Sequence, residues 1–451
     1  MGHKLLGSLT ALCACMVFLC VGASAMTIYV ETPDDKTLTL EVESGDSIDY
    51  VKQKICEQIS LPTDGQYLYF SGKLLKEFTL SDYNVHRGSI LWLSKSEIPE
   101  PSGTTLTNNN IANYMILSDG TYHLDAIVQA GGYSVKSIDI FSPLTITSDV
   151  TLDLNGYVLK MTGTGAVIHV ESGATLTLTD SKPRAVHKFT VREDGLWVLD
   201  EDNGTMLARG GIITGGSTAS GGGVYVSSGG KFNMNGGTIT GCTATGDGGG
   251  VYAAPDGTMT MNSDASISGC TAADGAGIYL VGTLNANGGT VGRAVKVAAL
   301  DDGAGTKGHG HIATTGGSGT TFTAKVTVER HSGGEVGKIS GGTFDGEVVN
   351  QGEIDGGTFH AKVSNGEPGS NSSVGAITGG TFTGEVTNNV GSTISGGTFH
   401  GAVTNIGTIN NGTFAGTVTN KTDGAQSSGG GGNAGTIHDG TFTGTVTNDK
   451  D

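Results

Sequence analysis

Six copies of one short pattern of apolar and polar residues fill the C-terminal third of the chain. In each copy an Ile lies five residues before a Phe, a Val lies four residues after it and an Asn six residues after it. The aromatic positions are Phe344, Phe359, Phe382, Phe399, Phe414 and Phe442. The shortest spacing, 15 residues, is too small for a pair of helices and fits one turn of a β-solenoid. The pattern predicts a coil of short strands over residues 311–451.

Alternation within each copy predicts which side chains are buried. From the Phe onward, alternate positions hold Phe, Gly or Ala, Val and Asn, and the positions between them are mostly polar. A strand sends successive side chains to opposite faces, and neighbouring turns of a parallel coil lie about 4.8 Å apart. We therefore expect inward columns of Ile, Phe, Val and Asn, with Asn amides hydrogen-bonded from turn to turn. The longer spacings all follow the Asn, which predicts loops along one edge.

Residues 119–310 show the same kind of alternation with a longer period. Short apolar strands recur at intervals of about 27 to 30 residues, at 167–170, 196–198, 224–226, 251–253 and 278–280. Second and third short strands follow several of them, and three strands per turn describe a right-handed parallel β-helix. The alternating segment 145–154, which precedes these turns, predicts a cap over the open edge of the coil.

Residues 26–96 show a different pattern. Two alternating segments, 26–30 and 38–42, predict a hairpin. A helix should follow, capped by Asp46 or Ser47, with Ile48, Val51, Ile55 and Ile59 on its apolar face. Short strands fit at 67–70 and 90–93.

The residues of this segment resemble ubiquitin. The matching stretches, in the same order and spacing, are 26–30, 36–43, 51–55 and 79–84. The resemblance implies a β-grasp fold. Ubiquitin is conjugated through a C-terminal Gly-Gly, whereas this chain runs on through Leu93 into Ser94 and beyond, so conjugation is not expected. At the positions of the family's hydrophobic recognition patch stand Pro33, Tyr69 and Trp92, which we expect to form a protein-interaction patch.

The longer turns resemble the pectate-lyase-like repeats of large secreted bacterial surface proteins and adhesins. The resemblance is carried by residues 222–226, Gly-Gly-Val-Tyr-Val, and by residues 234–239, Met-Asn-Gly-Gly-Thr-Ile. It spans roughly residues 119–292 and implies the fold more than any activity.

Two segments lie outside these units. Residues 1–25 combine His3 and Lys4 with an apolar run and a final Ala-Ser-Ala, the arrangement of a signal peptide for secretion. Residues 97–118, which are polar and contain Pro99 and Pro101, predict a linker. We expect no membrane span once the signal is removed. The chain ends in the phase of a repeat, which leaves open whether the reading frame is truncated.

Composition supports a thin stacked fold. The 451 residues include 78 Gly and are only 36% hydrophobic, which argues against one large globular core. The net charge of −18 disfavours nucleic acid and anionic membranes as partners.

Three cysteines follow the predicted signal peptide. Cys242 and Cys270 occupy matching Gly-Cys-Thr-Ala contexts in consecutive turns, so their Cα atoms should stack within the range of a disulfide. A bridge and a pair of buried thiols are both consistent with this placement. Cys56 lies on the predicted helix, where core packing is expected.

Catalytic and metal-binding patterns are scarce in the chain. Asp149, Asp153 and Asp180, with Arg184 or Lys188 as base, are the candidates for a calcium-dependent polysaccharide lyase, but Asp is also favoured in turns. His309 and His311 form an H-x-H pair without a third ligand in sequence. We expect no catalytic residue, metal or cofactor.

Together these observations predict a mainly β chain, with a β-grasp α+β module followed by a single-stranded parallel β-helix or β-solenoid. The function expected is that of a secreted or surface-exposed bacterial adhesin-like protein that binds host or environmental glycans or proteins. Two alternatives stay open: a β-helix carbohydrate-active enzyme, and a ubiquitin mimic that binds host ubiquitin-system proteins.

Overall fold

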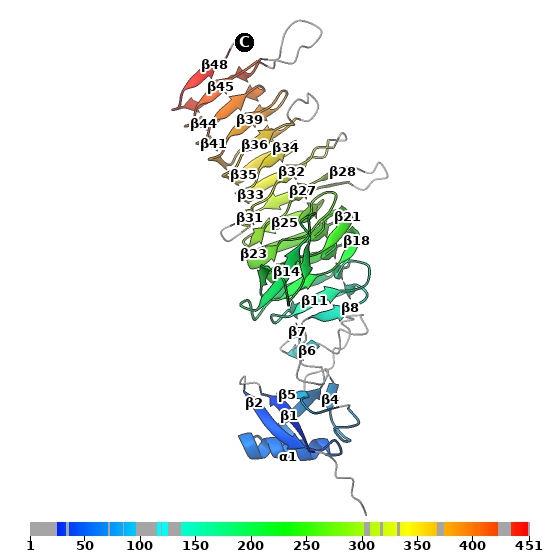
Figure 1. Cartoon of the computed structure of the whole chain (residues 1–451). Coiled ribbons are helices and arrows are strands. Elements are labelled where there is room, and N and C mark those ends of the chain that lie inside the picture. Colours follow the sequence, from blue (N-terminus) through cyan, green and yellow to red (C-terminus); the bar gives the residue numbers. More distant parts are fainter. Residues whose placement is uncertain are drawn as a thin grey trace, which may run out of the picture. The chain divides into compact units, whose positions relative to one another are not determined.

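The chain folds into two compact units. The computed structural model describes residues 25–32, 36–70, 73–83, 85–95, 115–118, 120–124, 137–301, 307–315, 319–331, 334–367, 374–422 and 434–449. One unit lies between residues 25 and 95 and the other between residues 115 and 449 (Figure 1). Residues 1–24 of the predicted signal peptide and 97–114 of the predicted linker lie outside the described residues, so both stay predictions.

The first unit is a five-stranded mixed sheet with one helix packed on it. Its elements are β1 (Met26–Glu31), β2 (Thr37–Val42), α1 (Ile48–Ile59), η1 (Thr63–Gly65), β3 (Tyr67–Phe70), β4 (Lys73–Leu75) and β5 (Ile90–Ser94). The strand order is β2-β1-β5-β3-β4, with β1 antiparallel to β2 and parallel to β5. This arrangement is the β-grasp fold, as predicted.

Helix α1 begins and packs as its sequence indicates. The Ser47 hydroxyl accepts a hydrogen bond from the Tyr50 backbone N–H at 3.2 Å, which fixes the N-terminus. Ile48, Val51 and Ile55 are buried against the sheet, where each contributes about 1.5–3 kcal/mol of hydrophobic stabilisation. Ile59 at the last turn is only partly buried.

The second unit is a solenoid built mainly from two long parallel sheets. The 13-stranded sheet contains β9 (Leu144–Ile146), β12 (Ile168–Val170), β19 (Val224–Val226), β22 (Val251–Ala253), β24 (Ile278–Leu280), β27 (Val295–Val297), β32 (Val326–Val328), β34 (Val348–Asn350), β36 (Val363–Asn365), β39 (Val386–Asn388), β42 (Val403–Asn405), β45 (Val418–Asn420) and β48 (Val446–Asn448). The 23-stranded sheet contains β6 (Met115–Ser118), β7 (Thr121–Leu124), β8 (Ile138–Ile140), β10 (Val150–Asp153), β11 (Val158–Met161), β13 (Thr175–Thr179), β17 (Ile212–Thr214), β20 (Lys231–Ile239), β23 (Thr258–Ile267), β25 (Thr283–Ala286), β26 (Thr290–Val291), β30 (His311–Ala313), β31 (Thr321–Phe322), β33 (Lys338–Phe344), β35 (Glu353–Phe359), β37 (Ala376–Ile377), β38 (Thr381–Phe382), β40 (Thr393–Ile394), β41 (Thr398–Phe399), β43 (Thr408–Ile409), β44 (Thr413–Phe414), β46 (Thr436–Ile437) and β47 (Thr441–Phe442).

Smaller sheets are added at the corners of the solenoid. They are β14 (Val186–Val191), β15 (Trp197–Leu199) and β16 (Met206–Arg209) in one sheet, β18 (Ser217–Ser220) with β21 (Thr243–Asp247), and β28 (Ala299–Asp301) with β29 (Lys307–His309).

The columns predicted for the short turns are present. Successive Phe rings from Phe344 to Phe442 stack with centroids 4.7–4.9 Å apart, and Phe322 extends the column one turn earlier. Asn350, Asn365, Asn388, Asn405 and Asn420 form a chain in which each Nδ2 donates to the next Oδ1 at 2.7–2.8 Å. Stacked identical residues thus fix the register of the whole segment.

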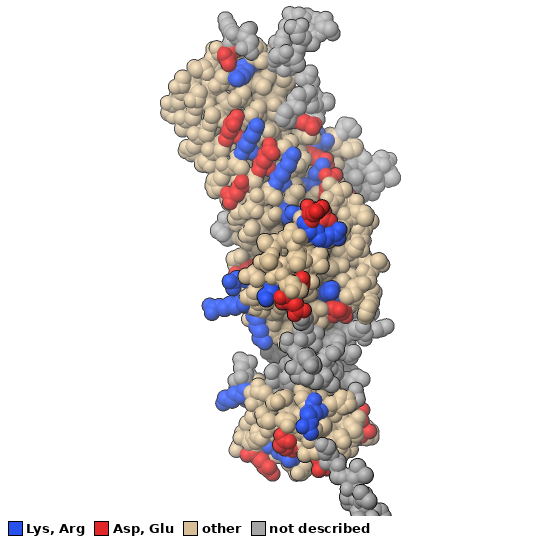
Figure 2. Space-filling view, viewed as in Figure 1, with Lys and Arg blue, Asp and Glu red and all other residues tan. Residues whose placement is uncertain are grey.

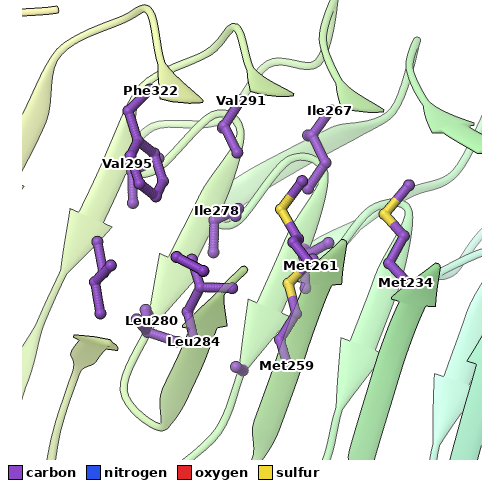
Figure 3. Close-up of a cluster of buried hydrophobic side chains, with 14 of the residues drawn as sticks. Met234, Met259, Met261, Ile267, Ile278, Leu280, Leu284, Val291, Val295 and Phe322 are labelled. Carbon is purple, nitrogen blue, oxygen red and sulfur yellow. The ribbon is translucent and has the colours of Figure 1, made fainter. Parts of the chain in front are cut away.

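The longer turns have a core of aliphatic side chains and methionines. Met234, Met259 and Met261 point inward beside Ile267 and Leu284 (Figure 3). Parallel pairing in register links the turns, as between Tyr225 and Tyr252. Because the flexible methionine side chain fills irregular gaps, this part of the core accommodates turns of unequal length.

Two predictions about the longer turns are wrong. The segment 196–198 is not a turn of the helix: it lies in the antiparallel sheet of β14, β15 and β16, and β12 pairs directly with β19. The segment 145–154 is not a cap but forms regular turns through β9 and β10. The antiparallel hairpin of β6 and β7 precedes it, and β7 pairs with β10.

Candidate functional site

The three-stranded insertion is the largest departure from the regular coil. Its strand order is β15-β14-β16, and all pairings are antiparallel. Alternation places Phe189 and Ala208 on the inner face, where they pack with Val158 and Ile212 of the solenoid. The insertion therefore has a small core of its own, fixed to the side of the coil.

Trp197 anchors the insertion on two glycines of the solenoid. The backbone N–H of Trp197 donates to the Gly269 carbonyl at 2.9 Å, and the ring lies over that residue. A Cβ on Gly269 would lie 2.3 Å from the ring, and one on Gly241 would lie 2.4 Å from the Trp197 carbonyl oxygen. Only glycine permits this approach.

A groove runs between the insertion and the outer surface of β20 and β23. Its volume is about 480 Å³. The insertion contributes Trp197, Leu207 and Arg209 to its lining, and the solenoid contributes Asp264 and Ser266 among other small polar residues. A half-buried aromatic ring beside hydroxyl, carboxylate and guanidinium groups suits a polyhydroxylated ligand, because such a ligand offers both C–H faces and hydrogen-bonding groups.

Asp180 also lines this groove, but its oxygens are engaged by the backbone. Oδ1 accepts from the Gly156 N–H at 2.8 Å, and Oδ2 accepts from the Gly211 N–H at 2.8 Å. These bonds join the turn at Gly156 to the end of the insertion at Gly211. The Asp180 carboxylate therefore has a structural role, because it holds these two backbone segments together.

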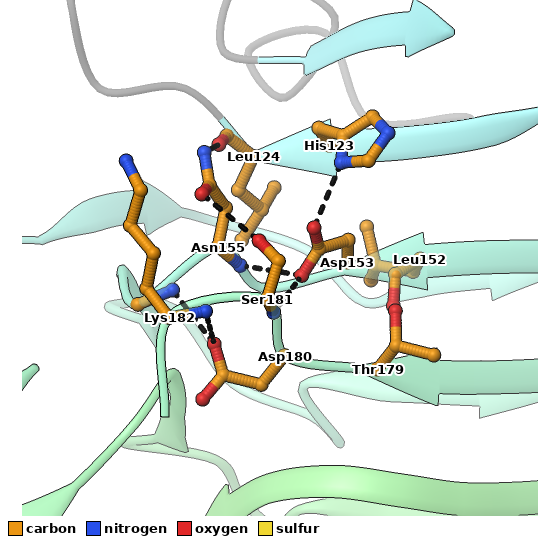
Figure 4. A network of polar contacts seen from close by, with 10 residues as sticks. His123, Leu124, Leu152, Asp153, Asn155, Thr179, Asp180, Ser181 and Lys182 are labelled. Atoms are coloured by element: carbon orange, nitrogen blue, oxygen red, sulfur yellow. Dashed lines mark hydrogen bonds and ion pairs between the residues drawn. The ribbon is translucent and has the colours of Figure 1, made fainter. Parts of the chain in front are cut away.

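Asp153 is the centre of a similar network (Figure 4). Its Oδ1 accepts from the backbone N–H groups of Asn155 and Ser181, both at 2.8 Å, and its Oδ2 contacts His123 Nδ1 at 2.8 Å. Burial raises the pKa of Asp153, but the hydrogen bonds from His123, Ser181 and Asn155 outweigh it and lower the pKa to about 2. The carboxylate stays ionised and bound to the turn.

The structure brings Asp153 and Asp180 into neighbouring turns (Figure 4), but among the described residues neither carboxylate forms an ion pair with Arg184 or Lys188. Asp153 and Asp180 hold turns, and Asp149 is exposed outside the groove. Lys188 projects from the outer face of β14, and Arg184 precedes that strand. Among the described residues, no three His, Cys, Asp or Glu side chains are placed to hold a metal ion.

His309 and His311 lie on different strands with different partners. His309 Nδ1 is 3.3 Å from a Glu335 carboxylate oxygen, whereas His311 Nε2 is 2.8 Å from the Ser340 hydroxyl. Burial, followed by the charge of Lys338, lowers the pKa of His311.

Cys242 and Cys270 are buried free thiols in adjacent turns. The next residues, Thr243 and Thr271, pair in parallel register, as the matching contexts indicate. The Cys242 thiol lies 3.5 Å from the Thr240 carbonyl oxygen, and burial raises its pKa well above the usual range. The bridge between them stays a prediction.

The predicted patch on the first unit falls largely outside the described side chains. Pro33 and the side chains of Tyr69 and Trp92 are among the parts not described. The backbones of Tyr69 and Trp92 are direct antiparallel partners in β3 and β5, so two of the three positions lie side by side.

An outward aromatic column was not predicted from the sequence. His169, Tyr225, Tyr252 and Tyr279 follow one another on the 13-stranded sheet, and the tyrosine rings stack with centroids 5.1 and 5.6 Å apart. Burial, with the nearby charges of Tyr225 and Asp247, raises the pKa of Tyr252 to about 12. Because the ring faces contact each other, they are not open to stack on a ligand.

Sequence reasoning also missed the groove, since it placed Trp197 in a regular turn of the helix. The signal that could have revealed the insertion is the pair of polar turns at 192–195 and 200–204, which separate three short alternating strands. Such spacing is typical of an antiparallel meander.

The fold and the groove define a β-solenoid protein with an N-terminal β-grasp module and a polar side groove. Residues 28–98 match the ubiquitin family. Over 69 residues the chain is 36% identical to NEDD8-like protein RUB3 of Arabidopsis thaliana, a match that covers 15% of this chain and 88% of that protein. The chain belongs to the ubiquitin family through this module.

In the part of the chain that the structure describes, no helix is long and apolar enough to cross a membrane.

Proposed function

We propose that the chain is an adhesin-like binding protein, exported to the surface or surroundings of a bacterium, whose solenoid binds glycans and displays a non-conjugatable ubiquitin-like module. The observation that carries the proposal is the groove at Trp197, with its mixture of aromatic, hydroxyl and charged groups. The leader-like residues 1–25 support export.

Binding is favoured over catalysis because the carboxylates proposed for chemistry have other roles. Asp153 and Asp180 accept hydrogen bonds from backbone amides that hold turns together. The polysaccharide lyase or hydrolase alternative would need a base and an acid free to reach a substrate. Asp264 in the groove is exposed, so it is available to bind a sugar hydroxyl.

A glycan panel tests the proposal with the chain from residue 26 to 451. We expect retention of one or more glycans, reduced at least tenfold by Asp264→Ala combined with Ser266→Ala. Asp149→Asn is the matched control, because this exposed carboxylate lies outside the groove. Retention of no glycan, or equal losses in control and groove variants, would refute it. Release of sugar fragments from the panel would instead support the enzyme alternative.

A second function is favoured by the ubiquitin-family match. The module has the β-grasp fold, and Tyr69 is the cross-strand partner of Trp92. The resemblance to ubiquitin implies that both positions belong to the family's recognition patch. We infer that this surface binds proteins of the ubiquitin system. A pulldown with residues 26–451 should recover ubiquitin receptors or conjugating enzymes, and Trp92→Ala should abolish the recovery. If neither class is recovered, mimicry is excluded.

A further inference from the structure

The outer face of the three-stranded insertion alternates apolar and basic side chains. Val186, Val198 and Leu207 are 46%, 41% and 55% exposed. Cross-strand register pairs Val186 with Arg209, Leu207 with Lys188, and Val198 with Thr190. Paired residues share a face, and this face is opposite to the one that carries Phe189 and Ala208.

Arg184 lies in the turn that leads into β14. The Ala185 N–H donates to the Lys182 carbonyl at 3.1 Å and closes this turn, and the Gly210 N–H donates to the Ala185 carbonyl at 2.9 Å. Arg184 is exposed and lies two residues before Val186. Lys188 and Arg209 project from the outer face of the adjacent strands β14 and β16, with Arg184 at the turn beside them.

The three basic residues at this face are not held in ion pairs by other described residues. Among the described residues, Arg184, Lys188 and Arg209 form no ion pair, whereas the neighbouring Arg192 contacts Asp194 at 3.4 Å. Figure 2 shows Lys and Arg side chains projecting from the region where Figure 1 places β14.

Such a face is unusual on a chain with a net charge of −18. Unpaired cations grouped on one surface attract anions and accelerate their association. The exposed Val and Leu side chains between them offer apolar contact area to the same partner. A partner that satisfies both is a polymer with anionic groups at short intervals and C–H faces between them.

We propose that this face binds an anionic polysaccharide, with sugar rings on Val186, Val198 and Leu207 and anionic groups on Arg184, Lys188 and Arg209. The inference rests on the proposed glycan-binding function and names its ligand class. Arg209 also lines the groove at Trp197, so the face and the groove share this residue.

The test measures binding of residues 26–451 to dextran sulfate, to uncharged dextran and to polyglutamate. We expect dextran sulfate to bind most tightly, with an affinity that falls steeply as salt rises. Combining Arg184→Ser with Lys188→Ser, which leaves the groove residue Arg209 in place, should weaken binding at least tenfold and flatten the salt dependence. Arg192→Ser is the matched control, an exposed arginine of the same insertion that already has a carboxylate partner. Circular dichroism and melting would verify that all variants fold.

The outcomes separate this inference from the proposed function. If dextran and dextran sulfate bind equally well, and only Asp264→Ala combined with Ser266→Ala abolishes this binding, the ligand is not an anionic polysaccharide. The proposed glycan binding by the groove would still hold. Equal binding of polyglutamate overturns the choice of a polysaccharide. If Arg192→Ser weakens the binding of dextran sulfate as much as the variant of the outer face does, the binding site is not this face. If dextran sulfate and the whole glycan panel fail to bind, both proposals fail.

Discussion

The buried asparagines show how one residue type can set the register of a long coil. Each Asn in the column donates Nδ2 to the next Oδ1 and also to a backbone carbonyl, as Asn388 does to Thr408 at 3.2 Å. A buried amide costs free energy unless its groups are paired. A slip of one residue would leave these amides unpaired, so the column selects one register.

Asn388→Ala should therefore destabilise the second unit by about 1–3 kcal/mol per hydrogen-bonding group left unpaired. The variant removes the acceptor of Asn365 and the donor to Asn405 at once. Thermal unfolding would measure the loss, and Asn410→Ala is the control because its bond to Ser395 is exposed. Equal melting of the two variants would contradict a structural role for the column.

Asp153 makes the stability of the solenoid depend on pH. Its pKa is about 2 in the folded chain and 3.8 ordinarily, so the unfolded chain binds the proton more readily. The carboxylate contributes stability above about pH 4, and this contribution is lost as the pH falls toward 2. The full effect is about 2 kcal/mol.

Asp153→Asn should reduce the slope of stability against pH between about pH 4 and 2. Chemical denaturation at a series of pH values would measure it, with Asp149→Asn as an exposed control. An unchanged slope in Asp153→Asn would show that other carboxylates dominate acid unfolding.

At the level of elements, the insertion depends on the close approach of Trp197 to the coil. Gly269 has φ +55° and lies against the indole ring. Gly269→Ala should displace the insertion, because the added Cβ would lie 2.3 Å from the ring. Gly173→Ala is a matched control: Gly173 has φ +80°, but a Cβ there meets nothing within 4 Å.

We expect Gly173→Ala to cost only about 1 kcal/mol, the strain of an alanine at positive φ, and Gly269→Ala to cost more. Tryptophan fluorescence would report the movement of Trp197, and ligand binding in the groove should weaken only in Gly269→Ala. Identical fluorescence in the two variants would mean that the insertion is held by other contacts.

The outer surface of the short turns carries charges of alternating sign. Lys325, Glu347, Lys362 and Glu385 occupy equivalent positions in neighbouring turns, just before the valines of β32, β34, β36 and β39. Figure 2 shows red and blue side chains alternating along this part of the unit. Opposite charges on adjacent strands favour this register over one that would place like charges together.

On the scale of the whole molecule, the two units have separate hydrophobic cores. One contains Ile28, Val51 and Leu93, and the other continues from Leu124 to Val418. Calorimetry of residues 26–451 should show two unfolding transitions, because each core is lost cooperatively on its own. Asn388→Ala should move only the transition of the second unit. A single transition that shifts as one would contradict this independence.

The sequence determined the repeating parts of this protein. Period and alternation predicted the Ile, Phe, Val and Asn columns, and the segments shared with ubiquitin predicted the first unit. These features are local or periodic, so each copy of the repeat carries the same pattern. The apolar side chains of one turn are buried when the next turn stacks on it.

Tertiary structure alone decided the place of Trp197, the groove beside it and the roles of Asp153 and Asp180. An apolar strand such as 196–198 fits a solenoid turn and an antiparallel insertion equally well, because both need only alternation. Its location depends on which backbone pairs with it and on glycines far along the chain, Gly241 and Gly269, that leave room for the ring. Such contacts join residues that have no periodic relation, and only the folded coil brings them together.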